Sequence, residues 1–221
     1  MQLPFTIDQF FGVFRAYNSA VWPAQLVLNG LAVLALLLIA VRRPWSGVAV
    51  SAILASLWVW LAAAYHLAFF APINPMAYAF AALSLAGGFM FAWHGVIRRN
   101  IQFTFSANPR GLAGVALIVF SLIVYPLWAT LAGHPYPELP TFGLPCPTTI
   151  FTIGLLCLAS STALRQVLAV PMLWSVVGSQ AAFLLDVMPD LGLLVAAVAA
   201  ATLLIGPTRG QAQRFPRGSE G

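Results

Sequence analysis

The sequence contains no lysine and few charged residues of either sign. Of its 221 residues, 7% are charged and 61% are hydrophobic, whereas a soluble domain carries about 25% charged residues. The ten basic side chains are all arginine, and they cluster at the ends of apolar runs, which is typical of membrane topology and not of nucleic-acid binding. The composition therefore predicts an integral protein of the lipid bilayer with no nucleic-acid partner.

The sequence also lacks the motifs of several membrane pumps and enzymes. The absence of lysine excludes a retinal protein, which needs a lysine in its last span. Its two cysteines, Cys146 and Cys157, lie in one apolar run, where a helix separates them by roughly 16 Å, too far for a disulfide. The absence of a Cys-x-x-Cys motif argues against a quinone-linked thiol oxidase. Three histidines at three depths argue against a His-rich metal hydrolase. The sequence also lacks a Gly-rich phosphate-binding loop, which argues against a nucleotide-driven pump.

Seven apolar runs approach the length of about 20 residues that a helix needs to cross the hydrocarbon core. They cover roughly 21–41, 47–70, 76–97, 111–132, 147–164, 168–186 and 190–206. Arginines follow the first, third, fifth and seventh runs, so the positive-inside rule places the N-terminus outside and the C-terminus in the cytoplasm. The sequence therefore predicts an all-α integral membrane protein with seven transmembrane helices.

The two ends of the chain differ from this apolar part. Residues 1–20 contain Thr6 and Gln9 at the spacing of a capping box, followed by a face of phenylalanines, which predicts a short amphipathic helix on the outer membrane surface. Residues 207–221 are polar with scattered proline and glycine, and we expect a disordered cytoplasmic tail. The seven-helix domain is thus expected to occupy residues 21–206.

Cys146 lies between two prolines at the outer end of the fifth predicted span. Pro147 suits the first position of a helix, which makes Cys146 the residue before it. A thiol at a helix N-terminus is a candidate soft-metal ligand or redox-sensitive group. The alternative is that the Pro-Cys-Pro segment simply begins a helix with a small residue.

Polar side chains within predicted spans are costly in lipid and are therefore candidates for function. Asn18, Gln25 and Asn29 fall on one helical face, where they either line a polar cavity or bond neighbouring helices. His66 lies about one turn inside the outer boundary and is either a ligand or proton acceptor, or a hydrogen-bonded structural residue. Asp186 ends the sixth span, with Arg15 as its expected counter-charge.

These residues fall in the outer half of the predicted bundle, where we expect a pocket. The candidate lining residues are Asn18, Gln25, Asn29, Tyr65, His66, Asn74, Tyr125, Thr149, Thr152, Ser179, Gln180 and Asp186. Within this layer His66, Cys146 and Asp186 would combine an imidazole, a thiolate and a carboxylate, a set that suits zinc or copper(I). The alternative is that each satisfies a separate local partner.

Four segments carry a resemblance to a known family. They are YNSAVWPAQ (17–25), AYHLAFFAPINP (64–75), HPYPELPTFGLPCPTTIFTIGLL (134–156) and PMLWSVVGSQAAFLLDVMPDLGLL (171–194). Together they resemble the bacterial domain of unknown function 6064 family of multi-pass membrane proteins, over nearly the whole chain to about Gly206. The resemblance implies a bacterial inner-membrane location, and it brings no established activity, cofactor or catalytic residue.

The sequence leaves three classes of function open. The first is a transporter or channel-like protein with an outward-facing polar pocket for a small solute or metal ion, because the polar stripe runs inward along the first span. The second is a non-catalytic membrane subunit that assembles with a larger complex or with copies of itself. The third is a thiol-dependent or metal-dependent membrane enzyme, for which no catalytic residue can be named.

Overall fold

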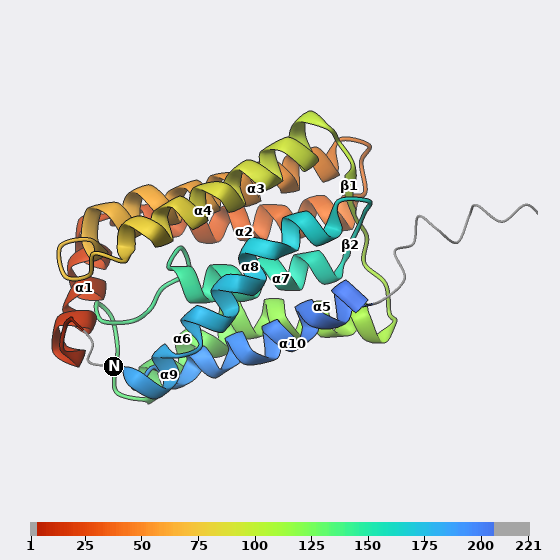
Figure 1. Cartoon of the computed structure of the whole chain (residues 1–221). Helices are drawn as coiled ribbons and strands as arrows, with labels where there is room; N and C mark the ends of the chain where they lie inside the picture. The colour runs from red at the N-terminus through yellow and green to blue at the C-terminus, as the bar shows by residue number, and fades with distance from the viewer. Residues whose placement is uncertain (1–3, 206–221) are drawn as a thin grey trace, which may run out of the picture.

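The computed structural model describes residues 4–205, and these form one elongated helical bundle (Figure 1). Its elements are α1 Ile7–Ala20, α2 Ala24–Val41, α3 Ser46–Trp60, η1 Leu61–Phe70, α4 Ala77–Phe91, η2 Ala92–Ile97, β1 Ile101–Phe103, α5 Pro109–Val119, η3 Phe120–Val124, α6 Tyr125–Leu131, α7 Pro145–Cys157, β2 Ala159–Ser161, α8 Leu164–Gly178, α9 Ala181–Leu184, η4 Met188–Asp190 and α10 Leu191–Ile205. Here η1, η2 and η3 are π-helical continuations of longer helices, and η4 is a 3-10 turn.

Six helical segments are long and apolar enough to cross a membrane. They are Ala24–Val41, Ser46–Phe70, Ala77–Ile97, Pro109–Leu131, Leu164–Leu184 and Met188–Ile205. Each corresponds to one of the predicted apolar runs, and large apolar side chains on their outer surfaces are exposed. These segments confirm the prediction of an all-helical protein suited to a membrane.

The fifth predicted run, 147–164, forms a shorter helix than the sequence predicts. The helix α7 has 13 residues and rises about 20 Å, less than the roughly 30 Å of the hydrocarbon core. It ends at Cys157, and strand β2 follows it. Among residues 4–205 the structure therefore gives six candidate spans and one shorter apolar helix.

The helix α7 occupies the centre of the bundle (Figure 1). Every residue of α7 is buried except Cys146, which is half-buried. It packs against α5 on one side and against α8 and α10 on others. A helix that is apolar around its whole circumference is expected to be buried on all sides, and α7 accordingly forms the core around which the longer helices are arranged.

The C-terminal end of α7 is fixed by a two-stranded sheet and an arginine. Strands β1 and β2 are antiparallel, with Ile101 opposite Ser161. Arg110 donates hydrogen bonds to the carbonyl oxygens of Leu156 and Ala159, at 3.1 and 2.5 Å. The cation thus satisfies carbonyl groups that the end of a helix leaves without intrahelical partners.

The first helix begins with the predicted capping box. The Gln9 amide donates to the Thr6 hydroxyl at 3.2 Å, and the Thr6 amide donates to the Gln9 side chain at 2.9 Å. The phenylalanine face of α1 is buried in an apolar cluster with η1, so it contacts protein. Placement of α1 at the membrane surface stays a prediction, and the predicted tail 207–221 lies outside the described residues.

Candidate functional site

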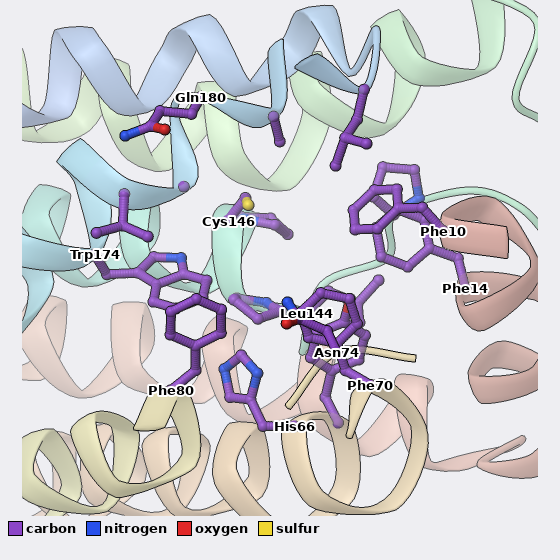
Figure 2. A pocket seen from close by; sticks show the side chains of 18 of the residues that line it. Phe10, Phe14, His66, Phe70, Asn74, Phe80, Leu144, Cys146, Trp174 and Gln180 are labelled. Carbon is purple, nitrogen blue, oxygen red and sulfur yellow. The ribbon is translucent and has the colours of Figure 1, made fainter. Parts of the chain in front are cut away.

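A cavity of about 190 Å³ lies between α1, η1, α4, α7, α8 and α9 (Figure 2). Its walls are mainly apolar, and most of the large side chains are aromatic. The aromatic lining residues are Phe5, Phe10, Phe14, Tyr65, Phe70, Phe80, Tyr125 and Trp174, and the other polar ones are His66, Asn74, Cys146 and Gln180. A cavity with apolar walls and a few polar groups is the usual form of a small-molecule site.

His66 is almost completely enclosed by these walls. Its side chain is 1% exposed, and Figure 2 shows the imidazole turned into the cavity. The ring centroids of Trp174 and Phe80 lie 5.2 and 5.8 Å from that of His66. Neither ring nitrogen of His66 has a hydrogen-bond partner among the described residues. Because buried polar groups are nearly always bonded, a group without a partner calls for an explanation.

The π-helix η1 determines where His66 points. It continues α3 without a break from Leu61 to Phe70, and both Tyr65 and His66 are buried in it. Short π-helical insertions are rare and are frequent at functional sites. This geometry could not be predicted from the sequence, since AAAYHLAFF has the composition of an ordinary helix.

Trp174 supplies a second polar group to the same wall. Its side chain is 6% exposed, and its indole nitrogen lies near the Cys146 sulfur, a weak acceptor. The indole N–H makes no hydrogen bond of good geometry within residues 4–205. Two enclosed nitrogen-bearing rings, those of His66 and Trp174, therefore lack strong partners at one cavity.

A buried pair supports the wall behind Cys146. The Tyr125 hydroxyl donates to the Asp190 carboxylate at 2.5 Å, and Asp190 is 1% exposed. The Cys146 thiol lies beside the same carboxylate. Asp190 is therefore held by a tyrosine of α6, a partner that sequence spacing cannot identify because 65 residues separate the two.

We expect Tyr125→Phe to lower the free energy of unfolding by about 1–3 kcal/mol, because the buried Asp190 carboxylate would lose its hydroxyl partner. Thermal unfolding of the purified protein in detergent measures the change. Tyr78→Phe is the matched control, since Tyr78 is 64% exposed. Equal unfolding temperatures for the two variants would contradict a stabilising role for the Tyr125–Asp190 bond.

A protein-family model described as a family of unknown function, DUF6064, matches residues 7–214. The chain belongs to the DUF6064 family. This match confirms the family resemblance found in the sequence. No curated protein and no solved structure matches the chain. The family description names no activity, so the function of this DUF6064 protein has to be argued from its own site.

The polar stripe of the first span in this DUF6064 protein does not line the cavity. Asn18 donates to the carbonyl oxygens of Pro137 and Leu139, both at 2.7 Å. Gln25 donates to the Asn18 carbonyl at 2.9 Å, and Asn29 donates to the Gln25 carbonyl at 2.8 Å. Of the two interpretations that the sequence left open, the structure supports bonding between segments for Asn18 and Gln25, whereas Asn29 bonds within α2.

The other predicted lining residues divide between the cavity and local bonds. Tyr65, His66, Asn74, Tyr125 and Gln180 line the cavity. Thr149, Thr152, Ser179 and Asp186 do not line it. Thr152 accepts a hydrogen bond from the Trp58 indole at 3.2 Å, and Ser179 donates to the Val176 carbonyl at 3.0 Å. Trp174 and the α1 phenylalanines are lining residues that the sequence did not identify.

The three predicted metal ligands do not come together in this structure. His66 and Cys146 share the cavity, but Asp186 is exposed at a left-handed turn, φ 59°, after α9 has ended. Arg15, its expected counter-charge, forms an ion pair with Glu138 instead. Within residues 4–205 no group of three or more His, Cys, Asp or Glu could hold a metal ion. The prediction of a His66–Cys146–Asp186 site is therefore corrected.

Proposed function

We propose that this DUF6064 protein is a membrane-embedded binding protein that takes up a small, mainly apolar molecule in the cavity around His66. The observation that carries the proposal is the imidazole of His66, which is 1% exposed, turned into the cavity and without a partner among the described residues. Leaving such a group unsatisfied costs about 1–3 kcal/mol. A bound molecule that hydrogen-bonds to the ring would offset this cost.

The dimensions of the cavity suit one substituted ring. A cavity of roughly 150 Å³ lined by apolar side chains holds benzene, and the cavity here is about 190 Å³. Its aromatic walls favour a flat molecule, since rings gain from stacked and edge-to-face contacts. Leu184 lines the cavity and is 51% exposed, which supports a mouth beside α9, within a candidate span.

The proposal includes a topology in the bacterial inner membrane. The N-terminus lies outside, the C-terminus lies in the cytoplasm, and α7 is a short seventh crossing surrounded by the other helices. Support comes from the arginines: Arg42 and Arg43 follow α2, Arg98 and Arg99 precede β1, and Arg165 follows β2, so all five belong to the end with the strands (Figure 1). The cavity then belongs to the outer half.

Transport, which the sequence favoured, would require a path through the inner half of the bundle. That half contains a continuous apolar cluster around α7, to which Trp58, Phe91 and Ile153 contribute fully buried side chains. Binding is therefore the better supported function. If vesicles containing the purified protein took up the bound compound, the proposed function would extend from binding to transport.

Binding of 4-fluorophenol, followed by fluorine NMR of the protein in detergent, tests the proposal. Ala181→Phe should weaken binding at least about tenfold, or about 1.4 kcal/mol, because Ala181 lines the cavity and the added ring would occupy it. Val176→Phe is the control, since Val176 is 52% exposed on α8. Equal affinity in the two variants, or no binding to the unmodified protein, would refute the proposal.

A further inference from the structure

We propose that the molecule bound at this site is a quinone, recognised by its flat ring and its carbonyl oxygens. The inference rests on the proposed function and adds the ligand class. Its starting point is the pair of enclosed rings that lack strong partners, the indole of Trp174 and the imidazole of His66. Their centroids are 5.2 Å apart, so a single small molecule can contact both.

The hydrogen-bonding character of this pair selects an acceptor. The Trp174 indole nitrogen can only donate, and a neutral histidine offers one N–H donor and one acceptor nitrogen. The Cys146 sulfur lies beside the indole N–H, but sulfur is a poor substitute for an oxygen acceptor. A carbonyl oxygen that reaches the edges of both rings would accept from both donors.

The lack of charged side chains on the cavity walls favours a neutral ligand. Among residues 4–205, no Arg, Asp or Glu lines the cavity. The nearest acidic group, Asp190, lies behind Cys146 and accepts from the Tyr125 hydroxyl. An anionic ligand would therefore have no counter-charge, and an ammonium ligand would have no carboxylate on these walls to pair with. An isolated charge taken into such a site pays a large desolvation cost.

The shape of the walls selects a flat ring. Phe80 stands perpendicular to Trp174, at 87° with centroids 5.2 Å apart, and is nearly parallel to Phe70, at 12°. These faces offer both edge and stacking contacts to an inserted ring. A benzoquinone combines such a ring with two carbonyl acceptors and no charge.

Free and lipid-tailed quinones share this chemistry. The exposed Leu184 at the mouth belongs to a segment suited to a membrane, so a tail could extend from the cavity into lipid. Cys146 and Cys157 lie at opposite ends of α7, so the site contains no dithiol pair, and the inference concerns binding of the ring alone.

Calorimetric titration of the full chain in detergent, with duroquinone and durene, tests the inference. Durene is the same tetramethylated ring without the carbonyl oxygens, and duroquinone has no ring hydrogen at which the Cys146 thiol could substitute. We expect duroquinone to bind at least about tenfold more tightly than durene. His66→Phe and Trp174→Phe should each reduce this preference to about threefold or less, with little change in durene affinity. Trp93→Phe, in η2 at the other end of the bundle, should leave the preference unchanged.

The other possible results are also informative. Equal affinities for duroquinone and durene would overturn the quinone inference and leave the apolar binding function intact. Tighter binding of benzyltrimethylammonium than of duroquinone would also overturn it, in favour of a cation site. If neither ring compound nor 4-fluorophenol binds, the proposed function itself fails. With the decyl-tailed ubiquinone analogue, a further gain in affinity would assign the site to lipid quinones, and a loss would assign it to free quinones.

Discussion

Replacing Asn18 with leucine is expected to lower the free energy of unfolding by about 3–5 kcal/mol. Asn18 is fully buried, and its amide nitrogen donates to the carbonyls of Pro137 and Leu139 while its oxygen accepts from the Thr141 hydroxyl, each at 2.7 Å. Leucine would leave these three groups without their partner. Each unsatisfied buried group costs about 1–3 kcal/mol, and some of the cost is recovered where water reaches the loop.

Asn29→Leu is the matched control because it changes the same residue type on the same polar stripe. Asn29 is exposed and makes one bond, to the Gln25 carbonyl. Its replacement should therefore change stability by less than about 1 kcal/mol. Unfolding followed by heat or by increasing SDS in mixed micelles compares the two variants. A loss in Asn29→Leu as large as that in Asn18→Leu would show that the stripe, and not the loop contacts of Asn18, determines stability.

The same substitution connects stability to the site. The loop that Asn18 holds leads to Pro140 and Leu144, which line the cavity. A variant that retains its fold should therefore bind 4-fluorophenol more weakly, because one wall is no longer fixed. Asn18 thus acts as a positioning residue for the cavity, although its own side chain does not line it.

Features that depend on neighbouring residues in sequence could be predicted. Apolar run length alone identifies the six candidate spans, since the cost of leaving a polar backbone in lipid allows few alternatives to a helix. The capping box of Thr6 and Gln9 also follows from local spacing. The length of α7 was overestimated because apolar content was counted through Ser160, Ser161 and Thr162. Those three consecutive hydroxyl side chains were the available signal that the helix had ended.

Features that depend on the packing of distant segments could not be predicted. The sequence predicts His66 and Cys146 at one depth, and both line one cavity in the structure. The acid near them is Asp190 and not Asp186, because the chain turns after α9 and leaves Asp186 exposed. Spacing gives the depth of a residue in a bundle but not the direction of its side chain beyond a helix end.

The aromatic walls illustrate the same limit. A face of phenylalanines on α1 suits a membrane surface and a protein surface equally well, and only the fold shows Phe10 and Phe14 against η1. Trp174 was overlooked because a tryptophan within an apolar span is unremarkable. The cavity is therefore more apolar than the polar pocket that the sequence predicted, and this difference is what favours a ring-shaped ligand over an ion.

Replacing Gly114 with alanine is expected to destabilise the protein by about 1–3 kcal/mol through overpacking. A Cβ atom at Gly114 of α5 would lie 2.7 Å from the Gly154 carbonyl oxygen and 2.8 Å from the Cys157 Cβ of α7. Small residues allow this close approach of two helices. The obstructing atoms belong to the backbone and to a Cβ, so no side-chain rotation can relieve the contact.

Gly30→Ala is the control, since a Cβ atom at Gly30 of α2 would meet nothing within 4 Å. Alanine is also the better helix former by about 1 kcal/mol, so this variant should unfold at an unchanged or higher temperature. Equal unfolding temperatures for Gly114→Ala and Gly30→Ala would contradict the close packing of α5 on α7.

Because α7 is enclosed on all sides, a displacement at Gly154 has to be transmitted along the helix. Cys146 lies at its other end on the cavity wall, and folded Gly114→Ala protein should accordingly bind duroquinone more weakly than Gly30→Ala protein.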